Sequence, residues 1–266
     1  MNTEQKLLMQ ESYLSEEKIS QFKENEIYSQ LKIPKDFSFI VRLDGWKFQF
    51  LCKKLKVEKP FDIKIAKCLV DASKKVFRVF SPSIAYVISD EINLLFVRKY
   101  LFNGRIEKIN SILSGLISSS FSLNLKKYFK KAETISFDSR VIVLPDKSIL
   151  DYFAWRQLNG WRNHNNAYAY WLFRKLGYSP KESSERLKGL KSEQIHEILF
   201  KHGINLSKTP AWQRRGIIVY KETYEKETDK AKVKRRKITE NWNLPPFTSE
   251  EGKELLRKII TESWRK

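Results

Sequence analysis

The chain has few of the residues that build disulfide frameworks or zinc sites. Its 266 residues include two cysteines, Cys52 and Cys68, and three histidines. Two cysteines are too few for a disulfide scaffold, and with so few histidines a structural zinc site is disfavoured. Cys68 falls within a helical pattern, where burial as a small apolar residue is the better interpretation. The hydrophobic fraction of 41% suits a packed globular core.

Long apolar runs are also missing, and so is an N-terminal targeting pattern. No stretch is long and apolar enough to span a bilayer. The N-terminus, MNTEQK, lacks the features of a signal peptide. These absences predict a cytoplasmic protein with no membrane partner. The length leaves room for one large domain or two small ones.

Acidic residues are scarce relative to basic ones. The sequence holds 31 Asp and Glu against 51 Lys and Arg, which gives a formal net charge of +20. Such an excess favours a polyanionic partner, although a generally basic proteome is an alternative reading. The densest basic run lies at 230–237, and this uneven placement favours nucleic-acid binding. Its RNA-contact candidates are Lys234, Arg235 and Arg236.

Hydrophobic patterning predicts a ferredoxin-like core. Strand-like runs occur at 39–45 (FIVRLDG), 84–88 (IAYVI), 92–97 (INLLFV) and 141–144 (VIVL). Between them, apolar residues recur at three- and four-residue steps over 65–79 and 109–117, which is the helical period. The order βαββαβ is the split βαβ pattern of ferredoxin-like sheets, in the α/β (α+β) class.

The first and third strands carry carboxylates at ends that are expected to meet. In this topology the third strand runs antiparallel beside the first, which brings Asp44 beside Asp90 and Glu91. Clustered carboxylates repel each other, and Mg²⁺ between them would relieve this, since it takes one or two carboxylates plus substrate phosphates. Two such ions can hold the attacking and leaving oxygens of phosphoryl transfer. The alternative is an Asp-Gly turn and a polar hairpin tip, and spacing alone does not separate the two.

Further motifs occur in a fixed order along the chain. They are VRLDG at 41–45 with Phe48, KP at 59–60, AY at 85–86, SDE at 89–91, FD at 137–138 with Arg140, DY at 151–152, WRQ at 155–157, WRNH at 161–164 and NAYAY at 166–170. As an ordered set they resemble the tRNA-His guanylyltransferase family. The 161–170 block resembles its archaeal branch of guanylyltransferase-like proteins. The resemblance runs from about Phe39 to about Tyr220.

The resemblance implies a polymerase-type palm with added helices and a basic C-terminal extension. Members add nucleotides to the 5′ end of tRNA in the 3′-to-5′ direction. The 5′-monophosphate is activated with ATP, and the 3′-hydroxyl of GTP then attacks it. The implied cofactors are two Mg²⁺ ions, and the implied assembly is a homotetramer. The substrate is tRNA-His, a truncated tRNA or both.

The resemblance also implies roles for individual residues. Asp44, Asp90 and Glu91 would form the catalytic acidic cluster, and the metal ligands would be Asp44, Asp90 and the carbonyl of Gly45. The residues implied for nucleotide and phosphate binding are Gly45, Trp46, Lys47, Phe48, Gln49, Lys59, Ser89 and Arg105. Arg105 stands at a predicted helix start, where free N–H groups attract anions, and a plain surface arginine is the alternative.

A long helical region from Leu150 to Gly177 follows the palm and is rich in aromatics. Most of these aromatics are expected in the core. The polar set expected to face RNA or nucleotide comprises Arg156, Arg162, Asn163 and His164. For His164, a positioning hydrogen bond is preferred over general-acid chemistry.

The sequence departs from the family pattern in three places. Trp46 stands where arginine is frequent, Gln49 stands where eukaryotic members have histidine, and 161–166 replaces the eukaryotic HINN block. These departures concern how the histidine anticodon is read. They leave the metal site untouched.

Four parts are predicted along the chain. These are an N-terminal segment (1–36) with one or two amphipathic helices, the palm-like core (37–147), a helical region with a closing strand (148–220), and a basic extension with a final helix (221–266). Two other functions compete with 5′ nucleotide addition. A nucleotidyl cyclase can share the palm but does not explain the basic excess. A non-catalytic RNA-binding palm protein is expected to lack an acidic residue, and none is missing.

Overall fold

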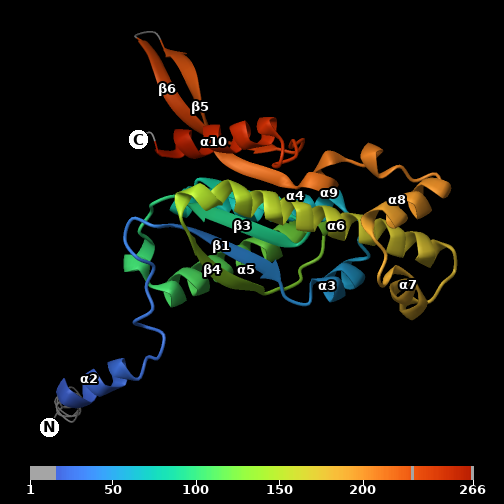
Figure 1. Cartoon of the computed structure of the whole chain (residues 1–266). Coiled ribbons are helices and arrows are strands. Elements are labelled where there is room, and N and C mark those ends of the chain that lie inside the picture. The colour runs from blue at the N-terminus through green and yellow to red at the C-terminus, as the bar shows by residue number, and fades with distance from the viewer. Residues whose placement is uncertain (1–15, 229–230, 265–266) are drawn as a thin grey trace.

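The computed structural model describes residues 16–228 and 231–264 (Figure 1). Of the predicted N-terminal helices, it contains α2 (Glu16–Glu24). Leu7, Leu8, Tyr13 and Leu14, on which that prediction partly rested, lie outside the described residues. In Figure 1, α2 stands away from the body of the molecule.

The described strands form one antiparallel sheet in the order β4-β1-β3-β2-β5-β6. They are β1 (Ser38–Gly45), β2 (Ile84–Ile88), β3 (Glu91–Phe96), β4 (Phe137–Leu144), β5 (Ile217–Thr228) and β6 (Ala231–Asn241). The first four strands have the predicted βαββαβ connectivity, so the ferredoxin-like prediction is confirmed. An all-antiparallel sheet with separate helices belongs to the α+β class.

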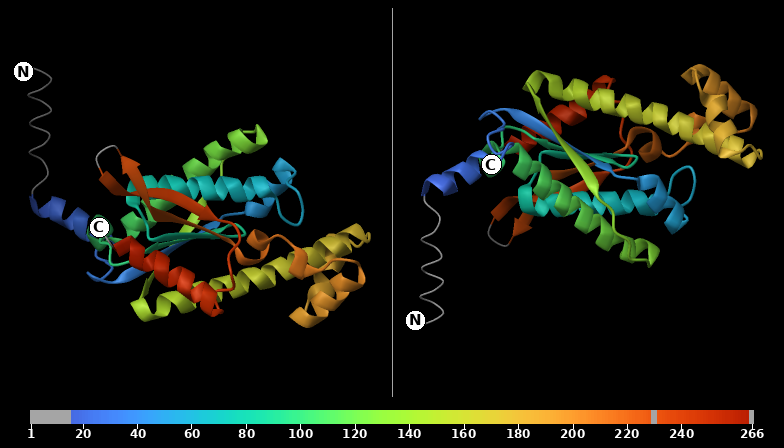
Figure 2. Two further views of the ribbon diagram at one scale, coloured as in Figure 1. Left: turned by 90° about the horizontal axis from the view of Figure 1, so that it is seen from above. Right: turned by 90° about the horizontal axis from the view of Figure 1, so that it is seen from below.

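Helices cover both faces of the sheet (Figure 2). The α-helices after α2 are α3 (Phe48–Leu55), α4 (Ile63–Phe80), α5 (Ile106–Phe129), α6 (Ile149–Lys175), α7 (Pro180–Leu187), α8 (Ser192–Lys201), α9 (Ala211–Arg215) and α10 (Glu250–Trp264). The 3-10 turns are Leu101–Gly104, Asp146–Ser148 and Leu206–Lys208. The side chain of Asp62 caps α4 by accepting a 2.7 Å hydrogen bond from the backbone N–H of Lys64.

Alternation along the strands divides the core between the two faces. Val41 and Leu43 of β1 pack with α4 and α5, whereas Ile40 packs with α6 and α10. Arg42 and Asp44 share the parity of Ile40, so they lie on the α6 face. In the part of the chain that the structure describes, no helix is both long and apolar enough to cross a membrane.

The α6 helix is longer than the sheet that it covers, and its C-terminal half carries a second layer of helices. Ala169 and Leu172 of α6 form a small core with Ile195 and Leu199 of α8. A capping box at Ser179 starts α7, where the Ser179 hydroxyl accepts from the Glu182 N–H at 3.2 Å. α9 lies against α6 and β2, next to the start of β5.

The basic run near the C-terminus is mainly a strand. The described part of it forms β6 and pairs with β5 along its length, so the predicted basic extension includes one arm of a β-hairpin. Lys230 lies outside the described residues. β5 crosses the predicted boundary at position 220 and extends the palm sheet through its pairing with β2. Figure 1 shows the tip of this hairpin projecting from the body.

Candidate active site

Asp44 lies between two other carboxylates at one edge of the palm. It is paired with Glu91 of β3 on one side and with Asp138 of β4 on the other. Residues directly opposite in an antiparallel pair share a face and have close Cβ atoms. The predicted meeting of Asp44 with the 90–91 turn is therefore present. Asp138, part of the FD motif at 137–138, adds a third acidic position.

The negative charge of this cluster is poorly compensated. Burial and then the neighbouring Asp90, Glu91 and Asp138 raise the pKa of Asp44 to about 6, against a small opposing effect of Arg140. The pKa of Asp90 is also raised, mainly by burial, although the Ser89 hydroxyl donates to its carboxylate at 3.0 Å. Both carboxylates would hold their charge more readily beside a cation.

Glu91 is already neutralised by α6. Its side chain is buried, and Arg156 donates to it through Nε at 2.8 Å and through Nη2 at 2.5 Å. Asn93 donates to the same carboxylate at 2.8 Å. Both carboxylate oxygens of Glu91 are therefore occupied, and its catalytic role stays a prediction. Arg156, predicted to contact RNA, is instead paired with Glu91 inside the protein.

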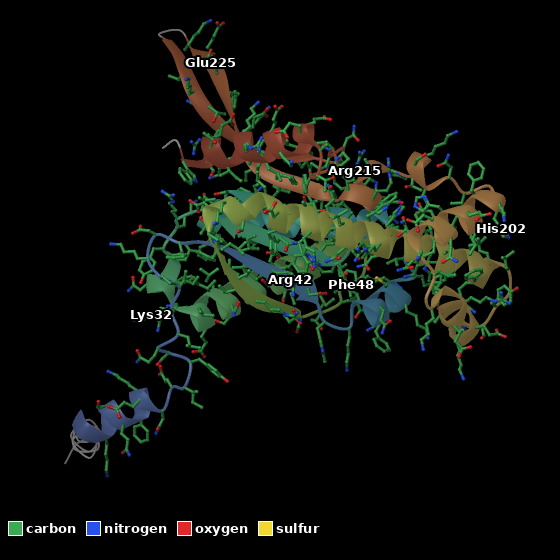
Figure 3. All side chains as sticks on the ribbon, viewed as in Figure 1. Lys32, Arg42, Phe48, His202, Arg215 and Glu225 are labelled. Atoms are coloured by element: carbon green, nitrogen blue, oxygen red, sulfur yellow. The ribbon has the colours of Figure 1, made fainter. Side chains whose placement is uncertain are left out.

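A hollow of about 250 Å³ opens beside Asp90. It lies between the 89–90 turn, α3, the start of α4, α6 and α9. Among the sequence-predicted site residues, those that line it are Phe48, Gln49, Lys59, Ser89, Asp90 and Asn163. Residues from four separate segments of the chain therefore converge on one cavity. Arg42 of β1 and Phe48 at the start of α3 are labelled in Figure 3.

The floor of this region depends on Gly45. A Cβ atom at position 45 would overlap the ring of Phe48, which is buried beneath it. Without a side chain at Gly45, the chain turns directly from β1 into α3, with Lys47 in the left-handed conformation at φ 52°. This turn is what brings Gln49 to the hollow while Asp44 remains on the sheet. The local Asp-Gly chemistry is thus used to change direction.

Lys59 lies at the mouth of the hollow and is exposed. Its ammonium is 5.4 Å from the ring centre of Trp171, which holds the side chain loosely against α6. It follows the sequence Val57–Glu58 and precedes the cap residue Asp62, whose second carboxylate oxygen accepts from the Glu58 N–H at 3.0 Å. The ammonium of Lys59 is therefore carried to the hollow by a loop that this hydrogen bond holds in place.

Other predicted residues are not brought to this hollow. Gly45, Trp46 and Lys47 are not among its lining residues, and Trp46 and Lys47 are exposed, so their predicted nucleotide contacts stay a prediction. Arg105 forms a backbone bridge with Lys32, beyond the opposite end of β1. Lys234, Arg235 and Arg236 lie on the exposed β6 strand. Arg162 is exposed on α6.

His164 is buried, which corrects its placement toward RNA. Its ring lies 5.6 Å from that of Phe61 and 5.2 Å from that of Trp161, both stacked. Its nitrogens form hydrogen bonds with Asn165 Oδ1 at 3.1 Å and Thr209 Oγ1 at 3.0 Å. Burial lowers its pKa to about 4, so the imidazole is neutral near pH 7. It joins α6 to the segment before α9, a positioning role.

Sequence reasoning missed residues that the tertiary fold adds to the hollow. Trp212 and Gln213 of α9 line it together with Ala167 of α6. Gln213 accepts a 2.6 Å hydrogen bond from the hydroxyl of Tyr168. The only signal in the sequence was the NAYAY motif that contains Tyr168. Among the described residues, no three His, Cys, Asp or Glu side chains come together closely enough to hold a metal by themselves.

Comparison with known proteins places the chain in one family. The family model described as tRNAHis guanylyltransferase matches residues 19–145, and that of the Thg1 C terminal domain matches 147–253. The probable tRNA(His) guanylyltransferase of Dictyostelium discoideum is 32% identical over 216 residues, 77% of this chain and 84% of that protein. The enzyme of Debaryomyces hansenii is 34% identical over 206 residues, 73% of this chain and 77% of that protein.

Solved structures share the fold. A bacterial tRNA(His) guanylyltransferase-like protein in complex with ATP matches with a TM-score of 0.75 at 24% identity, over 91% of this chain and 97% of that one. The tRNA(His) guanylyltransferase of Saccharomyces cerevisiae matches with a TM-score of 0.66 at 26% identity, over 79% of this chain and 93% of that one. With both family models matched in order, the chain belongs to the tRNA-His guanylyltransferase family.

Proposed function

We propose that this protein is a nucleotidyltransferase that adds nucleotides, typically GMP from GTP, to the 5′ end of tRNA in the 3′-to-5′ direction. The 5′-monophosphate is first activated with ATP. The product is tRNA-His carrying an added G, a repaired truncated tRNA, or both. The supporting observation is the pair of under-compensated carboxylates, Asp44 and Asp90, beside a hollow that also presents Lys59.

The residues present fit Mg²⁺. Asp44 and Asp90 both have raised pKa values, which means that the fold holds negative charge without enough positive charge nearby. Glu91 is neutralised by Arg156, so it does not compete for the ion. We assign the ligands as Asp44, Asp90 and the carbonyl of Gly45, with substrate phosphates completing the coordination of two ions. When bound, Mg²⁺ stabilises the charge that develops on the transferring phosphoryl group.

The chain's own residues orient the reactants. Ser89 donates to Asp90 and so restricts the rotation of that carboxylate. Because Gly45 carries no side chain, the ring of Phe48 can pack against it and keep the turn from β1 into α3. Lys59 is placed to pair with the triphosphate, and Gln49 and Asn163 supply polar contacts within the hollow. Solved relatives in complex with ATP and with GTP are consistent with a nucleotide site in this fold.

Two alternatives make different demands. A nucleotidyl cyclase needs no RNA, and it would leave the exposed cations of β6 without a purpose. A non-catalytic RNA-binding palm protein would have no need for two neighbouring carboxyl groups, Asp44 and Asp90, whose charged forms are disfavoured by burial. The electrostatic cost at these two residues favours the enzyme.

The test is a 5′-extension assay. The substrate is a 5′-monophosphorylated tRNA that lacks its first nucleotide, supplied with ATP, Mg²⁺ and GTP labelled at the α-phosphate. We expect label at the 5′ end, dependent on ATP. RNA that already carries a 5′-triphosphate should be extended without ATP. Label at the 3′ end, or cyclic nucleotide formed without RNA, would contradict the proposal.

The β6 strand is proposed to contact tRNA phosphates. Lys234, Arg235 and Arg236 are exposed on the projecting hairpin, where Figure 3 labels Glu225 on the partner strand. Changing all three to serine should weaken binding broadly across tRNAs and flatten its salt dependence. For duplex contacts the slope of log K against log salt falls by about 0.9 per phosphate lost. Filter binding at several salt concentrations measures this.

The matched control removes the same charge elsewhere. Lys175, Lys181 and Lys188 are exposed around the end of α6 and on α7, far along the chain from the hairpin. Serine at these three positions should leave the slope nearly unchanged. If the salt dependence flattened equally in both triple variants, the overall positive charge of the protein would account for it, and no contact would be specific to the hairpin.

We further propose a homotetramer located in the cytoplasm. The tetramer rests on the family resemblance, and the location rests on the missing signal-peptide pattern and the missing long apolar run. Light scattering coupled to size-exclusion chromatography measures the assembly directly. A monomer at micromolar concentration would remove the tetramer from the proposal.

A further inference from the structure

Two large aromatic side chains beside the acidic site face solvent. Trp46 is 60% exposed and Phe50 is 62% exposed. Trp46 comes directly after Gly45, and Phe50 lies on the first turn of α3. Neither residue lines the hollow beside Asp90. Such aromatics have no role in the core, because the same helix buries Phe48 and Leu51 for that purpose.

The backbone that carries them is well held. The N–H of Trp46 donates to the carbonyl of Ser136 at 2.9 Å, which ties the segment to the residue before β4. The N–H of Phe50 donates to the carbonyl of Lys47 at 3.0 Å. The buried ring of Phe48 locks the same turn against Gly45. The two aromatics therefore have a fixed relation to Asp44 and are not on a free loop.

The surface around them is cationic. The ammonium of Lys47 is 4.4 Å from the ring centre of Trp46. Lys53 and Lys56 are exposed along the same helix and its end. Aromatic rings interleaved with lysines are the chemistry of single-stranded nucleic-acid surfaces, where bases stack on the rings and phosphates pair with the cations. In a contact with a second protein chain, such rings more commonly lie in an apolar core that is depleted of lysine, whereas here lysines stand directly beside them.

We propose that Trp46 and Phe50 form a stacking ledge for the terminal bases of the RNA, beside the metal-binding carboxylates. This inference rests on the proposed function and adds a determinant to it. The two rings stack on the terminal bases at the 5′ end that is being extended. Lys47 pairs with a neighbouring phosphate. The ledge fixes the position of the RNA end, whereas the hollow holds the nucleotide.

The test uses RNA binding and a spectroscopic signal that do not require catalysis. A tRNA carries 2-aminopurine as its first 5′ nucleotide, and its fluorescence is followed as the full-length protein is added. Stacking should quench the fluorescence. Trp46→Ala should remove most of this quenching and weaken RNA binding about ten-fold, the order expected for one stacked base. Phe50→Ala should act in the same direction, and Trp46→Phe should restore most of both signals.

Trp264 provides a matched control. It is 46% exposed, and the guanidinium of Arg98 lies 4.7 Å from its ring centre, so it repeats the pairing of a cation with an exposed tryptophan. It lies on the last turn of α10, and Arg98 pairs with Asp146 beyond the start of β1, at the opposite end from Asp44. Trp264→Ala should change neither quenching nor affinity.

Three other outcomes would overturn the inference. Unchanged quenching in Trp46→Ala and Phe50→Ala would mean that the rings do not meet the base. A loss of ATP or GTP affinity in place of RNA affinity would make them part of the nucleotide site. If Trp46→Ala or Phe50→Ala changed the molecular mass of the assembly measured by light scattering, this face would be a contact between copies of the chain. Failure of 5′ extension with quenching intact would reject the proposed chemistry while keeping the ledge.

Discussion

Replacing Asp44 or Asp90 with asparagine should abolish nucleotide transfer without unfolding the protein. Each change keeps the size of the side chain and removes one charge from a site whose task is to hold a cation. Metal stabilisation of a phosphoryl transition state is worth several kcal/mol, and about 4 kcal/mol corresponds to roughly a thousand-fold in rate. Rates of 5′ activation and of transfer, measured separately at saturating Mg²⁺, should both fall by at least about that factor.

Asp44→Asn, although inactive, should be more stable than the wild type in the absence of metal. The folded state raises the pKa of Asp44 from 3.8 to about 6, so it disfavours the charged form. A raised carboxylate pKa costs no stability at low pH, where the group is protonated in both states, and costs most above pH 6. Asp44→Asn removes that cost. Without metal, its midpoint of thermal unfolding at pH 7.5 should lie above that of the wild type.

Magnesium should then separate the two proteins further. Mg²⁺ should raise the wild-type midpoint by binding the native state, and this shift should vanish in Asp44→Asn. Asp36→Asn is the control, since Asp36 is exposed before the start of β1, away from the acidic cluster. Near-normal activity of Asp44→Asn in Mg²⁺ would refute the metal assignment. A Mg²⁺ shift that persists would do the same.

The part of this site made by local pattern and topology was predictable from the sequence. Apolar periods identified β1, α4, β2, β3 and α5, and the ferredoxin-like connection then placed Asp44 opposite Glu91. That inference needs only strand order and direction, which follow from the order of the elements. It does not depend on side-chain packing.

Side-chain pairing across the fold was not predictable in the same way. Arg156 and Glu91 are 65 positions apart, and nothing local to either residue marks the other as its partner. Without that contact, Arg156 was interpreted as an RNA ligand and Glu91 as a free carboxylate. His164 was misplaced for a related reason. Its burial depends on Phe61, from the α3–α4 loop, and on Thr209, from the segment before α9.

The β5–β6 hairpin illustrates a different limit. A run of lysines and arginines has no apolar alternation, so periodicity does not distinguish a strand from a tail. The strand exists because β5 begins as a buried run, Ile217 to Val219, that pairs with β2. It then continues outward and offers β6 a long partner.

Arg156→Met should be among the most destabilising single changes in the chain. The substitution keeps most of the apolar stem of the side chain, but it leaves the buried Glu91 carboxylate with no full positive charge within hydrogen-bond reach. Arg42 approaches Glu91 only to 4.0 Å. Removing one partner of a buried ion pair typically costs about 3–5 kcal/mol, because the other charge remains out of water. Urea unfolding measures the loss.

A double variant shows whether the loss of stability arises from the unpaired charge of Glu91. Combining Arg156→Met with Glu91→Gln removes that charge, and Asn93 can still donate to the amide oxygen. Replacing a buried pair by neutral groups of similar volume is often nearly free, so the double variant should recover most of the stability lost by Arg156→Met. Arg162→Met, on the same helix but exposed, should stay within about 0.5 kcal/mol of the wild type.

The activity of the double variant separates support from chemistry. Glu91 follows Asp90 and begins β3, so the ion pair holds the turn that presents Asp90. If Glu91 only supports that turn, the stabilised double variant should retain a measurable fraction of wild-type transfer, far above that of Asp90→Asn. If Glu91 instead reacted directly, the double variant would be as inactive as Asp90→Asn despite its recovered stability. Single-turnover transfer well below the unfolding midpoint, compared across the three variants, distinguishes the two results.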